Sequence, residues 1–483
     1  MNLSLLNHEL LAVLLAVVVL LADLWLPESV RRKLGWVAVL GLAAILAYSL
    51  CCVSVPGESA RYAFGQMYVL DSLALFFKRF FLLATMIVLV IAMEFSDRFQ
   101  TGHAEFHAIS LCALAGMLFA SSVNDFAFLF VSLELITVSF YILTSYQRSR
   151  VVSLEAGVKY LIIGALSTGF TVFGIALVFG TTGRLNFGEL AAVSAQAASN
   201  KLFLLGLLLV MVGLGFKISA FPLQIWAPDV YQGAPTPTTA FLAIGSKAAG
   251  FVLLLRVLFT AVPAVAADWS GLLISIGAIT ILYGNLCALP QRNVKRLLGY
   301  SSIAHAGYLL LGVAALNAAG KAAVLFYLGG YLFTVLAAFT VIAVVLRHAD
   351  TEDVSGLAGL HQRSPLLAAG MLCAMVSLAG IPPLAGFFGK FLLIKAALAQ
   401  GPSDSGYYWL VAIAIVGVVI SMYYYFGIVR VMYWSKDASD LSAIRAPLPV
   451  RAAICGCMAG MLFVGVYPSP LLNWATTAVR VLQ

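Results

Sequence analysis

Four ionisable side chains lie in the middle of long apolar stretches of the sequence. They are Glu134 in FVSLELITV, Lys217 in GLGFKISAFP, Lys247 in LAIGSKAAG and Lys390 in GFFGKFLL. No charge adjacent in the sequence neutralises any of them. A charge in such surroundings costs about 2.5–3.5 kcal/mol on insertion scales, so it is retained where it faces a partner, protein-lined water or a transported ion.

The competing interpretation of these residues is a static ion pair, for instance between Glu134 and Lys217. Four such groups on four separate stretches favour a functional role over a set of unrelated pairs. His305, in SSIAHAGY, is a weaker candidate. An imidazole titrates near neutral pH and can carry protons, but a neutral, hydrogen-bonded core histidine fits the same pattern equally well.

Prolines interrupt two of these apolar stretches. Pro222 and Pro228 follow Lys217, and the sequence GIPPLAG, which ends at Gly386, precedes Lys390. Proline removes a backbone donor and disrupts the preceding helical turn. Unpaired carbonyls at membrane depth are tolerated where they line a cavity or are paired again by protein. We therefore expect both lysines to meet water beside a broken helix.

The composition places these residues in a membrane. Of the 483 residues, 62% are apolar and 10% are charged, and the mean hydropathy is +1.02. Soluble domains average about 45–50% apolar and about 25% charged residues. These values exclude soluble, disordered and collagen-like proteins and predict an all-α polytopic membrane protein. Fourteen apolar blocks have spanning length, near 5–26, 34–55, 69–93, 106–122, 125–146, 157–180, 202–226, 237–260, 270–289, 296–315, 321–346, 365–399, 407–433 and 450–470.

The first of these blocks is predicted to be a retained helix. It has no basic segment before its apolar part, and Glu9 lies in its first half, which is unlike a signal peptide. With fourteen spans, both termini are expected on the same side of the membrane.

Basic residues in the predicted loops set the orientation of the chain, because cytoplasmic loops carry more Lys and Arg. We expect the odd-numbered loops to face the cytoplasm and both termini to face outward. The odd loops hold fourteen basic residues (Arg31, Arg32, Lys33, Arg98, Arg148, Arg150, Arg292, Lys295, Arg296, Arg347, Arg363, Lys436, Arg445 and Arg451), against five elsewhere outside the spans (Arg61, Arg184, Lys201, Lys321 and Arg480).

The remaining basic residues in or near spans receive weaker interpretations. Lys159 and Lys295 stand at predicted cytoplasmic helix starts, where reaching out to the interface explains them. The sequence assigns no role to Lys78, Arg79 or Lys395. The aromatic runs, such as the one at 423–425, are interpreted as interface anchors and packing.

No cofactor, metal or nucleic acid is expected on this chain. The net charge of +8 comes from basic residues scattered singly between apolar blocks, which is not a nucleic-acid pattern. The seven cysteines lack the spacing of iron–sulfur or structural zinc sites. The sequence contains no glycine-rich nucleotide-binding motif.

The two broken spans suggest an internal repeat. They are the seventh and the twelfth, and discontinuous helices in corresponding positions of two halves are typical of inverted-repeat transporters. A spacing of five predicts two inverted five-helix repeats, spans 4–8 and 9–13. The expected divisions are 1–105 for the first three helices, 106–262 and 263–435 for the two repeats, and 436–483 for the last helix.

Three motifs resemble the antiporter-like proton-pumping subunits of respiratory complex I, the bacterial NADH–quinone oxidoreductase. They are KISAFPLQIWAPDVYQGAPTP from Lys217, NLCALPQRNVKRLLGYSSIAHAGYL from Asn285 and SLAGIPPLAGFFGKF from Ser377. The resemblance runs from about Glu134 to Tyr425. The wording PDVYQGAP is typical of one branch of that family and argues against the alternative, a subunit of a multi-subunit cation/proton antiporter. A static membrane scaffold, a third class, is disfavoured by the four mid-span charges.

The resemblance implies roles for individual residues. Glu134 and Lys217 match the family's glutamate–lysine pair, Lys247 its central lysine and Lys390 its terminal lysine, while His305 lies within a matched motif. At Gln224 many members of the family carry histidine, which puts a proton-carrying role at this position in doubt.

The resemblance also implies where the rest of the machinery lies. FMN, the iron–sulfur clusters and the quinone site would belong to partner subunits, with no cofactor in this chain. Its partners would be neighbouring antiporter-like and small membrane subunits and the lipid bilayer of the bacterial inner membrane. The implied function is proton translocation coupled to electron transfer from NADH to quinone in those other subunits.

Overall fold

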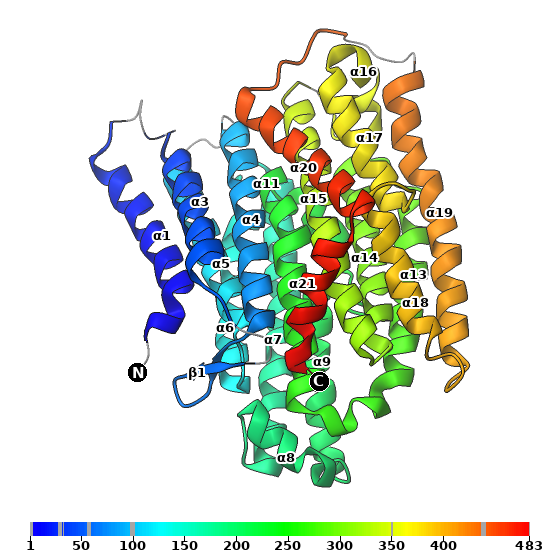
Figure 1. Ribbon diagram of the computed structural model, residues 1–483. Helices are drawn as coiled ribbons and strands as arrows, with labels where there is room; N and C mark the ends of the chain where they lie inside the picture. The colour runs from blue at the N-terminus through cyan, green and yellow to red at the C-terminus, as the bar shows by residue number, and fades with distance from the viewer. Residues whose placement is uncertain are drawn as a thin grey trace.

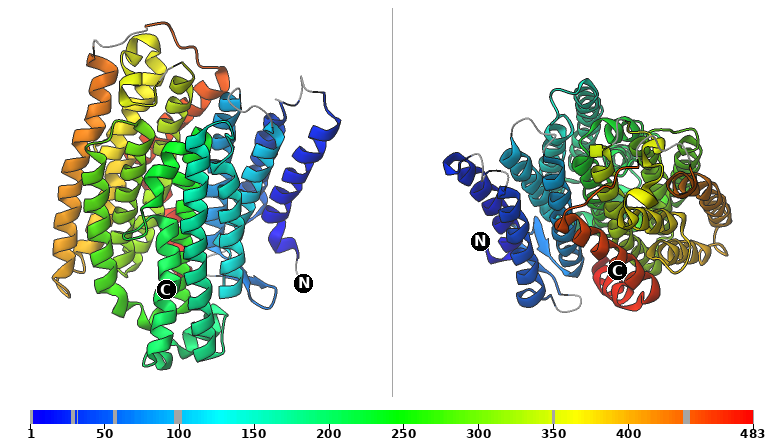
Figure 2. Two further views of the ribbon diagram at one scale, coloured as in Figure 1. Left: turned by 180° about the vertical axis from the view of Figure 1, so that it is seen from behind. Right: turned by 90° about the horizontal axis from the view of Figure 1, so that it is seen from above.

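The computed structural model describes residues 3–27, 31, 33–55, 59–96, 102–348, 351–435 and 441–482. Long helices stand side by side in an upright bundle, and both ends of the described chain lie at the same end of it (Figure 1). Seen from above, the first helices lie at one edge and α19 at the opposite edge (Figure 2).

Helices make up nearly all of the described chain. The longer ones are α1 (Asn7–Trp25), α3 (Leu34–Cys52), α4 (Ser72–Phe95), α5 (His103–Ser121), α6 (Phe126–Thr144), α7 (Val151–Thr182), α9 (Lys201–Ile218), α13 (Ser270–Ala288), α14 (Val294–Ala314), α15 (Ala318–His348), α17 (Pro365–Ala379), α18 (Ala385–Leu398), α19 (Gly406–Trp434) and α20 (Leu448–Val466). The shorter ones are α8 (Phe187–Ala197), α10 (Trp226–Gly233), α11 (Thr236–Phe241), α12 (Lys247–Arg256), α16 (Leu360–Arg363) and α21 (Ser469–Val479).

The predicted all-α membrane fold is confirmed. Thirteen helical segments of the described chain are long and apolar enough to cross a membrane. The twelfth predicted span, 365–399, consists of two shorter helices, α17 and α18. The sequence did not predict α8, α21 or the small antiparallel hairpin of β1 (Arg61–Ala63) and β2 (Tyr68–Leu70), because elements this short carry no spanning-length signal.

Both predicted helix breaks are present. Helix α9 ends at Ile218, Ser219 adopts a left-handed conformation with φ of 61°, and the chain resumes as α10. Helix α17 ends at Ala379, Gly380 has φ of 84°, and α18 begins at Ala385. In each case glycine or proline follows within a few residues, and the free carbonyls at the helix end become available to side chains.

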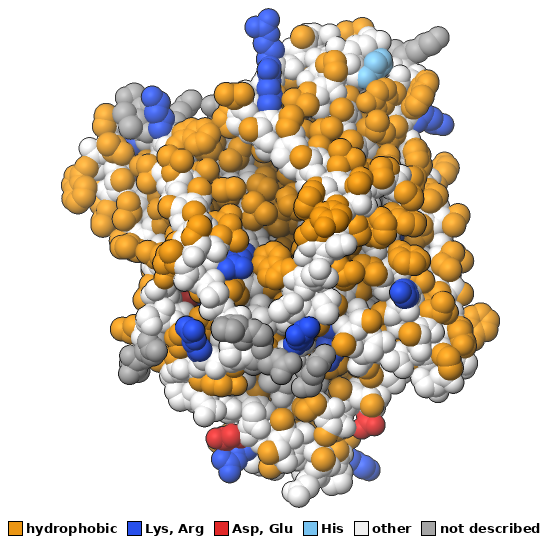
Figure 3. Space-filling model, viewed as in Figure 1, with side chains coloured by type: hydrophobic (Ala, Val, Ile, Leu, Met, Phe, Trp, Pro, Cys, Tyr) orange, Lys and Arg blue, Asp and Glu red, His pale blue; other side chains and the backbone are white. Residues whose placement is uncertain are grey.

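The outer surface of the bundle is mostly apolar. Figure 3 shows hydrophobic side chains over most of the visible face, with Lys and Arg at the top and scattered over the lower half. Exposed apolar residues such as Leu24, Leu166 and Val419 lie along the helices. A surface of this kind suits contact with lipid or with other membrane subunits rather than with water.

The loops rich in basic residues share one end of the bundle, opposite both chain ends. This end, called here the basic end, includes the connections from α6 to α7 and from α13 to α14, which carry Arg148 and Arg292. Three of the predicted basic loop residues, Arg32, Arg98 and Lys436, lie outside the described residues.

Glu352 joins two parts of the chain at the basic end. Its carboxylate accepts from Arg150 at 2.9 Å and lies 3.3 Å from Lys295 Nζ. Although its burial acts in the opposite direction, Lys295 and Arg150 lower the pKa of Glu352 below its ordinary value. The side chain of Lys295 is 1% exposed, so the prediction that it reaches the interface is wrong.

Asp229 of α10 forms a second connection near the same end. Its two carboxylate oxygens contact Lys159 of α7 at 2.8 Å and Arg296 of α14 at 2.5 Å. Because Lys159 and Arg296 come from distant parts of the sequence, Asp229 fixes α10 between α7 and α14. Helix α10, which follows the break after α9, is thereby held against α14, the helix that carries His305.

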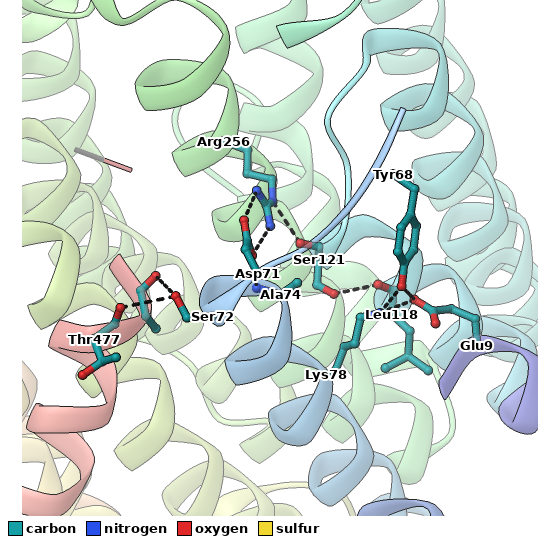
Figure 4. A network of polar contacts seen from close by, with 11 residues as sticks. Glu9, Tyr68, Asp71, Ser72, Ala74, Lys78, Leu118, Ser121, Arg256 and Thr477 are labelled. Atoms are coloured by element: carbon teal, nitrogen blue, oxygen red, sulfur yellow. Dashed lines mark hydrogen bonds and ion pairs between the residues drawn. The ribbon is translucent and has the colours of Figure 1, made fainter. Parts of the chain in front are cut away.

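A buried ion pair ties α1 to α4. Lys78 Nζ donates to Glu9 Oε1 at 2.6 Å and to the hydroxyl of Tyr68 at 2.6 Å, and that hydroxyl donates to Glu9 at 3.2 Å (Figure 4). Both charged side chains are 0% exposed. The acid that neutralises Lys78 is 69 positions away in the sequence, so local sequence patterns do not identify it. Arg79 donates to the backbone oxygens of Ser49 and Val53 at the end of α3.

A second buried pair fixes α12. Arg256, its last residue, donates to both oxygens of Asp71 at 2.8 and 3.0 Å and to the backbone oxygen of Ser121 at 2.9 Å (Figure 4). Asp71 also caps α4 by accepting from Ala74 N at 2.7 Å. A two-pronged pair of this kind restricts both distance and orientation. Helix α12, which begins with Lys247, is thus anchored at its far end to α4 and α5.

The pair of Glu9 and Lys78 predicts a stability effect. Glu9→Gln leaves a buried lysine without its counter-charge, which should cost about 3–5 kcal/mol. Heat-induced aggregation of the chain in solubilised membranes should shift to a clearly lower temperature. Adding Lys78→Met should restore part of the loss, because the unpaired charge is removed.

The matched control is Glu189→Gln. Glu189 pairs with Arg184 at 3.0 Å, and both side chains are more than half exposed, so the change should stay within about 1 kcal/mol. Equal effects of Glu9→Gln and Glu189→Gln would contradict a structural role for the buried pair.

Candidate functional site

Glu134 and Lys217 face a common space between α6, α7 and α9. Glu134, at mid-length in α6, accepts from Thr168 Oγ1 of α7 at 2.7 Å. Lys217, in the last turn of α9, is buried and donates to the hydroxyl of Thr137, which lies one turn after Glu134. No ion pair joins Glu134 to Lys217 among the described residues, so a static pair between them does not account for both.

A small cavity separates the two charged groups. Glu134, Thr168 and Lys217 all line it, and it leaves about 10 Å³ for the centre of a water molecule. That volume is close to the least that one water needs. The expectation that Lys217 meets water beside the helix break therefore fits the space around it.

Lys247 lies one turn from the place where α9 touches α12. It follows a π-helical turn, Leu242–Ser246, and is buried. A Cβ atom at Gly250, three residues on, would lie 3.2 Å from Cβ of Lys217 and 2.7 Å from Ile218. The glycine therefore lets the end of α9 approach α12 closely. No hydrogen bond connects the two lysines within the described chain.

Lys247 is held by α14. Its ammonium donates to the backbone oxygen and to the hydroxyl of Ser302. The Ser302 hydroxyl also lies 3.1 Å from the hydroxyl of Tyr231 in α10. Neutral oxygens, and no carboxylate among the described residues, therefore surround this lysine.

His305 stands on α14 three residues beyond Ser302 and is enclosed by tyrosines. Its Nδ1 is hydrogen-bonded to the hydroxyl of Tyr327, and its Nε2 lies 3.0 Å from that of Tyr425. The Tyr425 hydroxyl is also hydrogen-bonded to Ser301. A chain of exchangeable protons thus runs from Ser301, beside Ser302, to Tyr327.

Lys390 lies in α18, the second helix of the broken twelfth span. Its ammonium donates to the carbonyls of Leu378 at 2.7 Å and Ala379 at 3.2 Å, the last residues of α17. These carbonyls have no partner within their own helix. A Cβ at Gly380 would lie 2.9 Å from Cδ of Lys390, so a glycine with left-handed φ makes room for the lysine. The free carbonyls at the end of α17 thus hold the Lys390 ammonium.

The face of α14 brings Lys247, His305 and Lys390 together. Lys247 contacts Ser302, and the Lys390 ammonium lies 4.9 Å from the ring centre of Tyr308. The positions 302, 305 and 308 are spaced by three, so they follow one side of the helix over about 9 Å. Lys247, His305 and Lys390 thus lie along one face of α14, while Glu134 and Lys217 line a separate small cavity.

Sequence reasoning missed the hydroxyl groups that connect these residues. Tyr424 and Tyr425 are buried and hydrogen-bonded, so the predicted packing role fits them, whereas the predicted interface role fits Tyr423, which is 74% exposed. A local signal did exist for Ser301, because it stands four residues before His305 and therefore on the same helix face.

Gln224 and the cysteines are the remaining residues for which the sequence raised a question of function. Gln224 is buried between α9 and α10, and its Oε1 has no hydrogen-bond partner among the described residues. The described ranges hold no group of three or more His, Cys, Asp or Glu side chains that could bind a metal ion. All seven cysteines are free.

Comparison with known proteins identifies the family. Residues 123–421 match the family described as NADH:quinone oxidoreductase/Mrp antiporter, TM. NADH-quinone oxidoreductase subunit N of Trichlorobacter lovleyi is 39% identical over 484 aligned residues, covering 100% of this chain and 98% of that protein. Fold and sequence together define an antiporter-like membrane subunit. The chain belongs to the subunit N family of NADH-quinone oxidoreductases, the antiporter-like subunits of complex I.

Solved structures agree with this family. A chain of respiratory complex I from Thermus thermophilus is 32% identical, with a TM-score of 0.79, covering 96% of this chain and 98% of that one. A chain of the Mrp complex from Dietzia sp. is 21% identical with a TM-score of 0.80, covering 100% and 98%. At that identity the likeness shows the fold alone, whereas the full-length subunit N relative decides against the antiporter alternative.

Membership of the subunit N family defines the general role of this chain. The chain is a multi-pass membrane protein and a proton-translocating subunit of an NADH-quinone oxidoreductase, working together with other subunits of complex I. The redox cofactors of that enzyme are carried by partner subunits.

Proposed function

We propose that this chain translocates protons through a relay formed by Glu134, Lys217, Lys247, His305 and Lys390. The observation that carries the proposal is the shared face of α14, where Lys247 contacts Ser302 and Lys390 lies over Tyr308, with His305 between them. Electron transfer in partner subunits supplies the energy, because a pump needs an input that this chain has no group to provide.

The three lysines of the relay share one chemical feature. Lys217, Lys247 and Lys390 each donate to neutral oxygens, namely a threonine hydroxyl, a serine and backbone carbonyls. A buried lysine with a neutral acceptor can lose its proton without leaving an unpaired carboxylate behind. That supports a role in proton transfer, in contrast to Lys78, whose partner is the buried carboxylate of Glu9.

Glu134 and Lys217 form the variable part of the relay. A nearby carboxylate stabilises a buried ammonium, and burial alone destabilises it. Rotation of the Glu134 side chain away from Thr168 and into the cavity would bring its carboxylate closer to Lys217. Rotation back to Thr168 would move the carboxylate away from Lys217 again. The distance between these two groups thereby controls how readily Lys217 passes its proton to Lys247.

The second half of the relay runs along α14. A proton released by Lys247 has Ser302 of α14 as its first acceptor. Ser301 and His305 of the same helix follow, joined through the hydroxyl of Tyr425 on α19. Hydroxyl and imidazole groups can both accept and donate protons. Lys390 governs exit or onward coupling, and the repeats at 106–262 and 263–435 provide the two halves of the path.

The assembled protein is proposed to lie in the bacterial inner membrane among antiporter-like and small membrane subunits, with FMN, iron–sulfur clusters and quinone held by other partner subunits. The basic end faces the cytoplasm, and both termini face outward. The excess of Lys and Arg in loops of the basic end supports this orientation.

The test of the relay is Lys247→Arg. Arginine keeps the positive charge but is not deprotonated in proteins, so the variant should assemble while proton transfer falls about ten-fold or more, as for loss of an acid–base group. NADH-driven proton pumping and coupled quinone reduction are measured on the assembled complex in sealed vesicles.

Lys247→Ala serves as the companion variant. Alanine fits a helix and removes the charge, so folding should survive while pumping falls equally. Wild-type pumping per electron in Lys247→Arg would refute the relay and leave Lys247 as a fixed charge.

The orientation predicts opposite labelling of two engineered cysteines. Native cysteines are first replaced, because Cys51, Cys52 and Cys455 are exposed. A cysteine at Arg148, at the basic end, should react with an impermeant maleimide only from the cytoplasmic side. A cysteine at Arg184 should react only from outside, and the reverse pattern would overturn the orientation.

A further inference from the structure

A groove of about 760 Å³ opens at the basic end between three separate segments. The end of α13, the residues around Asp353 and the last turns of α19 form its walls, and its lining includes Leu289, Arg292, Tyr423 and Arg430. The volume falls within the range of small-molecule sites, about 300–1,000 Å³. The groove is separate from the relay described above.

Three charged side chains line the groove. Arg292, Arg430 and Asp353 make no side-chain hydrogen bond or ion pair with any described residue. Nearby basic residues of this end are paired, since Arg150 and Lys295 both contact Glu352. Two guanidinium groups and one carboxylate are therefore left to face whatever fills the groove.

An exposed apolar stripe leads from the groove toward the middle of the bundle. Val416, Val419, Tyr423 and Phe426 of α19 are all exposed, and Arg430 continues their spacing of three and four residues. Such spacing places them on one helix face. From Val416 to Arg430 the stripe is about 21 Å long, more than the roughly 15 Å of one hydrocarbon leaflet.

We propose that this groove binds a phospholipid whose headgroup carries both a phosphate and an ammonium, as an ethanolamine phospholipid does. Arg292 and Arg430 hold the phosphate, because guanidinium groups match phosphate geometry. Asp353 accepts from the ammonium, and an acyl chain follows the stripe on α19. A purely anionic lipid fits less well, because its charge would have no cation to offer Asp353.

The experiment uses the assembled complex in vesicles that contain phosphatidylethanolamine with a photoactivatable acyl chain. After illumination, labelled peptides are mapped by mass spectrometry. In the wild type, label should appear on 416–430 and be displaced by phosphatidylethanolamine more effectively than by phosphatidylglycerol. Arg292→Gln with Arg430→Gln should lower that labelling about ten-fold, because both guanidinium contacts to the phosphate are lost.

Two further variants sharpen the result. Asp353→Asn should remove the preference for the ethanolamine headgroup while labelling persists, and Arg445→Gln, an exposed arginine outside the groove, should leave labelling unchanged. Absence of label on 416–430 in the wild type would mean that a neighbouring subunit fills the groove and would overturn the proposal. So would equal labelling in the double arginine variant, or equal displacement by both lipids.

Discussion

A positive charge buried in a membrane must be held by an oxygen atom, and the kind of oxygen decides what the charge can do. In this protein Lys78 and Arg256 are held by carboxylates, at 2.6 and 2.8 Å. Loss of a proton from Lys78 would leave Glu9 charged and alone in an apolar core, which is costly. These pairs therefore act as fixed links between helices.

The relay lysines depend on the opposite arrangement. Their acceptors are hydroxyls and carbonyls. These groups are neutral, so loss of the lysine proton leaves no unpaired charge beside them. The fixed pairs and the relay are nevertheless connected, because Arg256 anchors the same helix, α12, that begins with Lys247. The static charges thus hold in place the elements on which proton movement depends.

The sequence predicts those features whose signals are local. Membrane spans follow from apolar length, and the breaks after Lys217 and before Lys390 follow from nearby proline and glycine. The partner of Lys78 could not be predicted, because Glu9 lies on another helix. The sequence predicts interface anchors and packing for the aromatic run at 423–425 but cannot assign these roles to individual residues. The structure does so, because Tyr425 is buried and Tyr423 is exposed.

The most direct test of the relay along α14 compares Tyr425→Phe with Tyr423→Phe. Each change removes one hydroxyl from the same turn of α19, but only the hydroxyl of Tyr425 joins Ser301 to His305. The measurement is the number of protons pumped per electron by the assembled complex in sealed vesicles. We predict a lowered ratio for Tyr425→Phe and the wild-type ratio for Tyr423→Phe. Unchanged ratios in both variants, with the complex intact, would contradict a proton path along this face.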